Sequence, residues 1–366
     1  MSIKSYDVEN YDLVMIKPYC REKVKTGRLK SILIKSLEGY SVTTITTIEE
    51  FEEYDFTGKR ILFAVALGES GINLEWYSIL KKIRKDKDCF KGCIGGIIVD
   101  GSSELYTKSF ARELVLSANM AGCIFVGRPL VEGTKSLDNF NIVAKNLDTD
   151  NLGAYMESGN DLVKRIMAFT PIKKEKPKIL MLHAGNRDTS NSLILWNSVK
   201  EHLNDCYIKE ISLRNGTILD CKGCSYNECL HFGEKGTCFY GGVISEQVYP
   251  SILEADALII VCANYNDAVS ANIAAFINRL TALFRTHRFY DKALFGIVVS
   301  GYSGGDIVAQ QLISSLNMNK TFYLPQRFAL METANNAGAV VGNEGIEERA
   351  KCFADNLIDT ICLKNV

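Results

Sequence analysis

Four cysteines in the second half of the chain have a spacing typical of a metal or redox centre. Cys221, Cys224, Cys229 and Cys238 follow the pattern C-x2-C-x4-C-x8-C. Intervening glycines would let the chain turn, so that four thiolates could surround a [4Fe–4S] cluster. A C-x2-C pair is equally half of a zinc site, in which His231 could replace one thiolate. A metal-free redox pair of Cys221 and Cys224 is a third interpretation.

A polar loop follows the apolar run at 179–182. Residues 186–192 carry amide, hydroxyl and guanidinium groups, and Gly185 permits a tight exit from a strand. Ser190 or Asn191 can cap a following helix, whose N-terminal amides and dipole would then face the loop. An anion fits there, most simply a phosphate. An ordinary helix cap explains the same residues, because the glycine spacing of known nucleotide loops is absent.

Two further polar segments follow apolar runs in the same half. Residues 263–266 end the run at 257–263, and residues 300–305 end the run at 294–300. The carboxyl ends of parallel strands meet at one edge of a sheet, where open α/β sheets bind ligands. The sequence therefore predicts that three loops converge on one site.

The elements that must position these loops form two similar sets. Strand-like runs alternate with amphipathic segments, which predicts parallel sheets with right-handed crossovers. A polar segment at 170–178 reads as a linker between domains at 1–170 and 171–366. The first set comprises strands at 11–16, 40–46, 61–67, 94–99 and 123–126, with helices at 27–37, 73–83 and 107–120. The second comprises strands at 179–182, 207–211, 257–263, 294–300 and 321–324, with helices from Ser190, at 273–284 and at 306–316, and a cysteine-rich insertion at 221–238.

The two sets share sequence in the same order. GGIIVDGSS at 95–103 matches FGIVVSGYS at 295–303, and LVLSANMAGCIFVGRP, ending at Pro129, matches LISSLNMNKTFYLP, ending at Pro325. This order suggests a duplicated domain, although any two strand–helix–strand units share some of the pattern. The first half has KPYCREKVK in place of the hydroxyl-rich loop. We therefore expect the first domain to be a degenerate copy without the phosphate site.

Composition narrows the function classes. The 366 residues are 47% apolar and 23% charged, with a net charge of −1. The sequence has no long basic run, so no nucleic-acid partner is expected. No apolar run approaches the roughly 18 residues that span a bilayer, so no membrane contact is expected. The first ten residues lack the apolar core of a secretory signal. We expect a cytoplasmic protein, whose 12 cysteines are mostly thiols, metal ligands or catalytic groups.

The second half resembles the flavodoxin-like NADPH-dependent FMN reductase family, and within it the iron–sulfur flavoproteins. The resemblance covers about residues 177–363 and rests on the three loops and the cysteine motif. It implies two flavodoxin-like doubly wound parallel-sheet domains, of which the second binds FMN. The cysteine motif is wider in its middle than the family's, so the [4Fe–4S] cluster stays one interpretation beside zinc and free thiols.

The resemblance also implies a role for each loop. Ligands of the FMN phosphate come from the first loop: Asn186, Arg187, Ser190, Asn191 and Ser192. Residues along the flavin ring come from the second loop: Ala263, Asn264, Tyr265 and Asn266. Residues beside its pyrimidine end come from the third loop: Ser300, Gly301, Tyr302, Ser303 and Gly304. Ala263, Ala274 and Asn278 depart from the family's usual proline, lysine and aspartate, which leaves the detailed flavin environment open.

Redox chemistry carried by the flavin is the expected function. No Ser-His-Asp set, paired acids or metal-hydrolase motif competes with it, and because the flavin carries the chemistry, the sequence leaves any catalytic side chain unknown. The first hypothesis is an FMN-dependent oxidoreductase that passes reducing equivalents from NAD(P)H or a ferredoxin to a small-molecule or protein acceptor. The alternative is a flavin and iron–sulfur electron carrier that serves a partner reductase. A non-catalytic redox sensor is a third class. Since members of the family often dimerise, the resemblance also implies a possible homo-oligomer.

Two further features each have two interpretations. His183 closes a strand just before the phosphate loop, where it faces the flavin or packs in the core. A basic group beyond the third strand of the second set forms a positive rim for NAD(P)H phosphates or a solvated helix end: Arg279, Arg285, His287 and Arg288.

Overall fold

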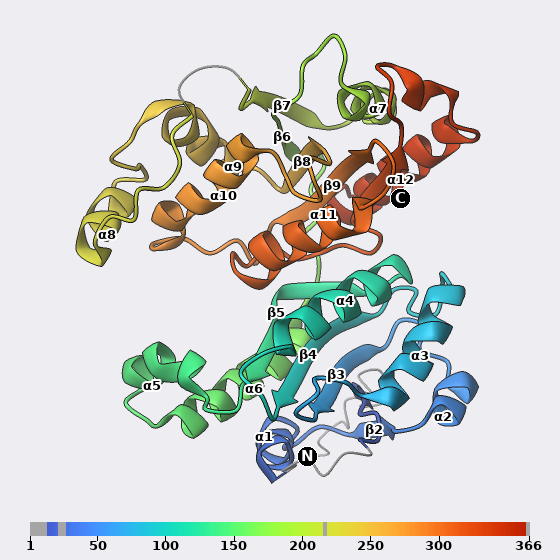
Figure 1. Cartoon of the computed structure of the whole chain (residues 1–366), viewed down its shortest axis with the longest axis vertical. Coiled ribbons are helices and arrows are strands. Elements are labelled where there is room, and N and C mark those ends of the chain that lie inside the picture. Colours follow the sequence, from blue (N-terminus) through green and yellow to red (C-terminus); the bar gives the residue numbers. More distant parts are fainter. Residues whose placement is uncertain (1–12, 21–26, 215–217, 364–366) are drawn as a thin grey trace, which may run out of the picture. The chain divides into compact units, whose positions relative to one another are not determined.

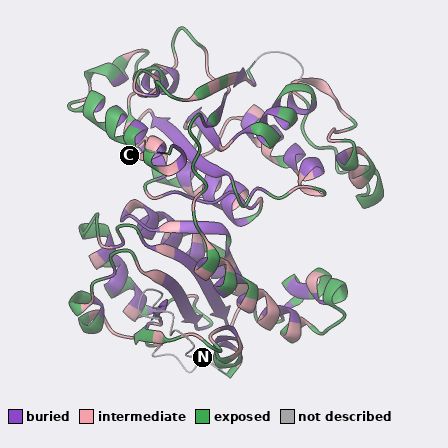
Figure 2. Ribbon diagram, turned by 180° about the vertical axis from the view of Figure 1, so that it is seen from behind, coloured by how far each residue is buried: buried purple, intermediate pink, exposed green. Residues whose placement is uncertain are grey.

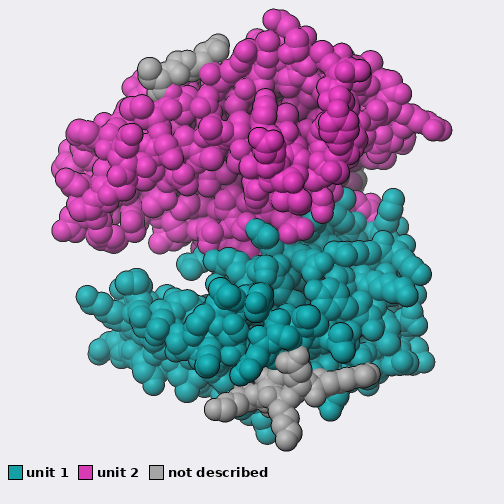
Figure 3. All heavy atoms as spheres, in the orientation of Figure 1, with its two compact units in different colours: residues 1–170 teal, residues 171–366 magenta. Residues whose placement is uncertain are grey.

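The computed structural model describes residues 13–20, 27–214 and 218–363. The chain divides into two compact units, residues 1–170 and 171–366, which Figure 3 colours separately. Each unit contains one five-stranded parallel sheet with helices along it (Figure 1). The predicted fold class, two flavodoxin-like α/β domains, is therefore confirmed.

The first unit has the strand order β2-β1-β3-β4-β5. Helices α1 and α6 pack together on one face, and the right-handed crossovers place α3 and α4 on the other. Its elements are β1 (Leu13–Ile16), α1 (Gly27–Ser36), β2 (Val42–Ile45), α2 (Ile48–Glu53), β3 (Arg60–Leu67), α3 (Leu74–Lys85), β4 (Ile94–Gly101), α4 (Thr107–Met120), β5 (Ile124–Gly133), a 3₁₀ turn (Asp138–Phe140), α5 (Asn141–Leu147) and α6 (Asn151–Ala168).

The second unit has the strand order β10-β9-β8-β6-β7. Helices α7 and α12 pack on one face, and α9, α10 and α11 lie on the other. Its elements are β6 (Lys178–His183), α7 (Asn191–Lys200), β7 (Tyr207–Ser212), α8 (Tyr226–Glu234), a π-helical turn (Ile244–Val248), α9 (Tyr249–Glu254), β8 (Ala257–Ala263), α10 (Ala271–Phe284), β9 (Ala293–Ser300), α11 (Gly305–Leu312), a second π-helical turn (Ile313–Met318), β10 (Ala329–Thr333), a 3₁₀ turn (Ala339–Gly342) and α12 (Ile346–Ile361).

Both sheets share one connection pattern: in each, the first strand lies between the second and the third. This is the doubly wound order in which the chain reverses direction beside the first strand. The central strands are covered on both faces, as the purple ribbon in Figure 2 shows, and read as continuous apolar runs. The core of each unit therefore holds its loops at the carboxyl edge of a rigid sheet.

The last predicted strand was wrong. Residues 321–324 form no strand, and Tyr323 makes only an isolated bridge with Ala293. The run is apolar because Phe322 packs in the core, its ring stacked 4.7 Å from that of Phe289. The actual final strand is β10, which reads ALMET because an edge strand buries less of its surface.

The last strand of the first unit extends further than predicted. The predicted strand at 123–126 is the beginning of β5, which continues through Pro129 to Gly133. A proline is tolerated because β5 lies at the edge of its sheet. The register shifts between Gly95 and Ile97 on the neighbouring strand, which absorbs the irregularity.

Two sequence predictions reach beyond the described residues. The first strand begins at Leu13, and residues 11 and 12 lie outside the described residues, as do residues 21–25 of KPYCREKVK. Within the described ranges, no helix is long and apolar enough to cross a membrane.

Candidate functional site

The three predicted loops converge at the carboxyl edge of the second sheet. Strand β8 pairs with β6 on one side and with β9 on the other, all in parallel. The loops after these three strands therefore leave the sheet side by side. From β6 the chain crosses to β7 on one side of β6, whereas β8 and β9 follow on the other side. The loops after β6 and β8 therefore flank the switch point, where such sheets bind ligands.

The first loop folds back tightly onto the start of α7. A Cβ on Gly185 would lie 2.7 Å from Ser190 Oγ and 3.1 Å from Ser190 Cβ, so a larger residue would have to displace Ser190. Ser190 is the N-cap residue of α7 but makes no side-chain capping bond. Its hydroxyl instead lies 2.9 Å from that of Ser192. The N-terminal amides of α7 therefore face the loop without a side-chain cap, as an anion site requires.

The side chain of Asn191 is engaged within the protein. Its Nδ2 donates to the carbonyls of Ala334 (3.1 Å) and Asn336 (2.8 Å), and its Oδ1 accepts from the backbone N–H of Val340 (3.3 Å). These bonds clamp the segment 334–340 against the start of α7. Of the residues assigned to the phosphate by resemblance, Asn191 thus has its amide used by the protein itself, while Arg187 is exposed in the loop.

The second loop is a tight turn. The backbones of Tyr265 and Ala268 exchange two hydrogen bonds, and Asn266 and Asp267 adopt positive φ values of 52° and 59°. Asn264 donates from Nδ2 to the carbonyl of Ser303 at 2.8 Å. This bond fixes the second loop to the third.

The third loop places a tyrosine in the open. Tyr302 is 81% exposed, and its hydroxyl accepts a hydrogen bond from Asn335 Nδ2 at 2.9 Å. Gly304 has a φ of +83°, and a Cβ there would lie 2.1 Å from Asp267 Oδ1. Asn191 bonds the segment 334–340, Asn335 of that segment bonds Tyr302, and Asn264 bonds Ser303. These hydrogen bonds link all three loops.

Several buried polar atoms at this edge have no hydrogen-bond partner. They are Asn264 Oδ1, Ser270 Oγ, Ser300 Oγ and His183 Nδ1. Buried polar groups are nearly always bonded, and each unmet group costs about 1–3 kcal/mol. Their arrangement at the ends of three neighbouring strands fits a polar ligand with several donors and acceptors, as the ring edge and phosphate of FMN have.

The corresponding edge of the first unit is closed by an ion pair. Arg28, in the first turn of α1, bonds both carboxylate oxygens of Asp100 at 2.9 Å and 3.0 Å. It also donates to the carbonyls of Gly101 (3.2 Å) and Lys135 (3.1 Å). The side chain of Asp100 is only 4% exposed. The guanidinium and the carboxylate thus satisfy each other where the second unit leaves its polar atoms unmet.

The four cysteines of the insertion lie around two tyrosines. Desolvation raises the pKa of Tyr240, and its neighbours Cys224, Cys238 and Cys221 raise it further. Burial likewise raises the pKa of Tyr249, and its neighbours Cys238, Cys229 and Cys221 raise it further. In the described part of the chain, no three His, Cys, Asp or Glu side chains are arranged to hold a metal ion. The four thiols are therefore neighbours without forming a closed ion site.

Arg279 holds both ends of this insertion. Its guanidinium donates to the carbonyl of Leu219 at 3.4 Å and to that of Gly241 at 2.7 Å, and the residue is only 2% exposed. It is therefore not part of a solvent-facing rim for NAD(P)H. The other basic residues expected at that rim are also engaged: Arg285 lies over the ring of Tyr226, Arg288 over Phe284, and His287 beside the hydroxyl of Thr286.

Helix α8 docks the insertion onto α10, beside which it lies in Figure 1. A Cβ on Gly233 would lie 2.3 Å from the carbonyl oxygen of Ala282, and the hydroxyl of Thr286 donates to the carbonyl of Gly233 at 3.2 Å. Asn278 adds a bond to Asp220 at 3.0 Å. Since α10 begins directly after the second loop, one helix supports both that loop and the cysteines. Helix α8 itself was not predicted from the sequence.

Comparison with known proteins agrees with the geometry of the three loops. A family model described as NADPH-dependent FMN reductase matches residues 177–336. The matched residues all lie in the second unit. The matched range contains all three loops and the cysteine insertion. No curated protein matches the chain.

Solved structures resemble about half of this chain. The apo form of an NADH:FMN oxidoreductase is 14% identical, covering 51% of this chain and 91% of that one at a TM-score of 0.37. An NAD(P)H:quinone oxidoreductase from Methanothermobacter marburgensis is 15% identical, covering 50% and 97% at 0.38. An FMN-dependent NADH-azoreductase from Bacillus anthracis str. Ames Ancestor, in complex with FMN, is 13% identical, covering 50% and 98% at 0.34.

Proposed function

We propose that the second unit binds FMN at the carboxyl edge of its sheet and passes reducing equivalents from NAD(P)H or a ferredoxin to a small acceptor. The observation that carries this proposal is the set of unmet buried polar atoms where the loops after β6, β8 and β9 meet, within the range that matches the FMN reductase family. When bound, FMN supplies hydride acceptance and electron transfer in one or two steps.

The residues of the site have separable roles in this proposal. Arg187, Ser190 and the amides at the start of α7 would hold the phosphate. Asn264 Oδ1 and Ser300 Oγ would bond the polar edge of the flavin ring. Tyr265 and Tyr302 are 52% and 81% exposed, so they offer aromatic surface to an acceptor that stacks against the site.

Turnover without a partner protein tests this function. Purified full-length chain, supplied with FMN, should oxidise NADPH or NADH in the presence of a quinone or an azo dye. The variant Ser190→Arg, which fills the anion site with a competing side chain and positive charge, should lose most of this rate. Full FMN loading with no turnover of either nucleotide, but rapid reduction by a ferredoxin, would instead favour a carrier.

A flavin and iron–sulfur electron carrier is the second candidate. The observation that favours it is the shared helix α10, which follows the flavin loop and carries the cysteine insertion through Arg279 and Asn278. Four cysteine thiols grouped around Tyr240 and Tyr249 match the donor chemistry of a [4Fe–4S] cluster. The acceptor in this case would be a protein.

Iron and acid-labile sulfide, assayed on protein purified without oxygen, test the cluster. About four of each per chain, lost in Cys224→Ser and retained in the control Cys352→Ser, would support it. Cys352 is a suitable control because it is exposed on α12, away from the insertion. Zinc in place of iron, or neither metal, would contradict the cluster and leave the FMN reductase function standing.

A single flavin per chain is part of the proposal. The Arg28–Asp100 ion pair, which occupies the corresponding edge of the first sheet, supports a first unit that keeps the scaffold but binds no FMN. Two flavins bound per chain would contradict this assignment.

A further inference from the structure

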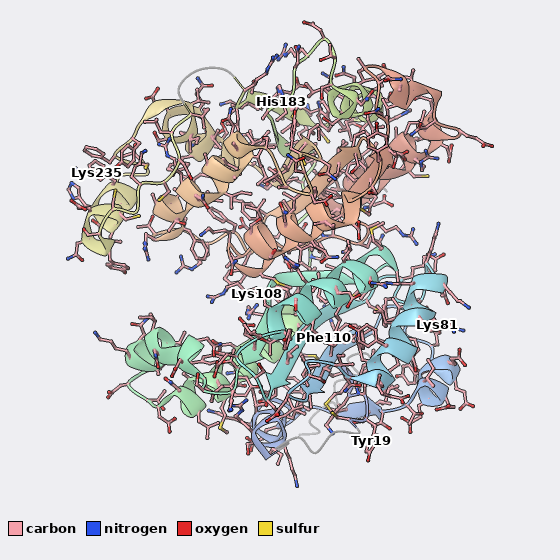
Figure 4. The ribbon with its side chains drawn as sticks, in the orientation of Figure 1. Tyr19, Lys81, Lys108, Phe110, His183 and Lys235 are labelled. Carbon is pink, nitrogen blue, oxygen red and sulfur yellow. The ribbon has the colours of Figure 1, made fainter. Side chains whose placement is uncertain are left out.

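Two cysteines that are far apart in the chain meet at the amino edge of the second sheet. The Sγ atoms of Cys206 and Cys362 lie 3.8 Å apart, although 156 positions separate the two residues in sequence. Cys206 directly precedes β7, and Cys362 directly follows α12. The pair therefore lies at the end of the sheet opposite His183, which closes β6 beside the first loop (Figure 4).

The short segment before β6 holds the backbone beside both cysteines. Lys174 in this segment forms a parallel bridge with Cys362. The backbone N–H of Tyr207, the residue after Cys206, donates to the carbonyl of Pro177 at 2.9 Å. The fold of the second unit thus keeps the two thiols next to each other.

A small movement would join the two sulfurs. A disulfide requires about 2.0 Å between its sulfur atoms. From 3.8 Å the sulfurs must approach by about 1.8 Å, a distance that rotation about a Cα–Cβ bond can supply. Cys206 is half-buried and Cys362 is 5% exposed, so the pair is open to a small oxidant through the side chain of Cys206.

Both sulfurs are protonated thiols near neutral pH. Burial, together with the neighbouring Cys362, raises the pKa of Cys206 to about 12. Burial also raises the pKa of Cys362, although the hydrogen bond from Cys206 lowers it in part. Because the thiolate is the reactive form, the pair stays reduced during a brief exposure to oxidant and reacts when the exposure is sustained.

We propose that Cys206 and Cys362 are an oxidation site, which hydrogen peroxide converts into a disulfide between the start of β7 and the end of α12. One sulfur, as its thiolate, attacks an oxygen of the peroxide, and the O–O bond breaks to give a sulfenic acid and hydroxide. The second sulfur loses its proton, displaces the sulfenic oxygen as hydroxide and forms the S–S bond. In total, two thiols are oxidised and one hydrogen peroxide is reduced to two molecules of water.

The disulfide would close a loop that contains most of the second unit. Residues 206–362 include strands β7, β8, β9 and β10 and the cysteine insertion. A cross-link over a loop of this length lowers the entropy of the unfolded chain, so the oxidised unit should resist unfolding better than the reduced one. Since the pair lies at the edge of the sheet opposite the three loops, the affinity for FMN should not change.

Peptide mapping of the full-length chain tests the site. Reduced protein is incubated with hydrogen peroxide, its remaining thiols are alkylated, and it is digested without a reductant. We expect two peptides linked through Cys206 and Cys362, which a reductant separates. If both cysteines are still alkylated after prolonged exposure that oxidises the exposed Cys352, or if either is linked to a different cysteine, the proposal is overturned.

Thermal unfolding tests the consequence of the link. Wild type and the control Cys352→Ser should each unfold at a temperature at least about 4 °C higher after oxidation, and a reductant should reverse the change. Cys206→Ser should show no such rise. An equal rise in Cys206→Ser would assign the effect to other cysteines, and a linked peptide in wild type without any rise would overturn the stabilising role.

Discussion

The side-chain amide of Asn264 donates to the backbone carbonyl of Ser303 over 2.8 Å, and this bond joins the second and third loops of the proposed FMN site. The next residue, Gly304, turns with a φ of +83° directly beside Asp267 and Asn264. A side chain at position 304 would have to displace both. The second and third loops therefore depend on glycine at position 304.

The variant Gly304→Ala tests this dependence. A Cβ there would lie 2.1 Å from Asp267 Oδ1 and 2.7 Å from Asn264 Nδ2, so the bond between the loops should break. We expect an unfolding free energy lower by about 2–3 kcal/mol and FMN affinity about tenfold weaker. The control Gly338→Ala has a φ of +76° with nothing within 4 Å, so it should lose only about 1 kcal/mol and keep its FMN affinity. Equal losses in the two variants would count against the steric explanation.

Asn191→Ala should release the segment 334–340. The change removes three hydrogen bonds and leaves the backbone N–H of Val340 unmet, which predicts a loss of about 2–3 kcal/mol in unfolding free energy. Hydrogen exchange at 334–340 should accelerate, while exchange in β8 stays slow. Asn197→Ala alters an exposed asparagine on the same helix and serves as the control. If exchange at 334–340 did not change, the clamp would have no role in ordering that segment.

Arg279→Met should loosen the cysteine insertion. The methionine keeps the apolar stem but withdraws the donors to the carbonyls of Leu219 and Gly241. We expect faster hydrogen exchange across residues 218–242 and a loss of about 2–3 kcal/mol in unfolding free energy, measured on protein prepared without iron. Arg288→Met, which changes an exposed arginine beyond α10, should leave exchange in the insertion unaltered. An insertion equally protected in both variants would show that α8 alone holds it.

The stability of the FMN-free protein should fall as the pH drops below about 6.5. Burial, with Arg187, lowers the pKa of His183 in the folded chain, so the unfolded chain takes up a proton that the folded chain refuses. Unfolding therefore becomes easier as the pH falls through the unfolded value, by at most about 1.4 kcal/mol per pH unit. Denaturant titrations between about pH 7 and pH 5.5 should show this slope in wild type and His202→Gln, and a smaller one in His183→Gln. The same slope in all three proteins would assign it to other groups.

A strand could be predicted from the sequence where its own residues determine its position in the sheet. The buried strands β3, β4, β8 and β9 are continuous apolar runs, and parallel strands require that type of sequence. Of the edge strands, β2 and β7 were predicted, but β10 was missed because it reads ALMET, and the length of β5 was missed because it passes through Pro129. Their positions follow from the neighbouring strand rather than from their own composition.

Some features of the candidate site could likewise be predicted from the sequence, and others could not. The three loops were predictable from polar residues directly after apolar strands, since parallel topology brings such ends together. The hydrogen-bond partner of a side chain could not be predicted, because the partner lies far along the chain. Asn191 bonds Ala334, Arg279 bonds Leu219, and the thiol of Cys206 lies 3.8 Å from that of Cys362. The unmet Nδ1 of His183 likewise becomes visible only when every neighbour is placed.

FMN binding and reduction can be followed together in an anaerobic titration of the full-length chain with FMN, after which NADPH or NADH is added. We expect one tightly bound FMN per chain and loss of the oxidised flavin's visible absorption after the nucleotide is added. A chain that binds no FMN, or binds it without any reduction by either nucleotide or by a ferredoxin, would contradict the assignment of the second unit as an FMN oxidoreductase.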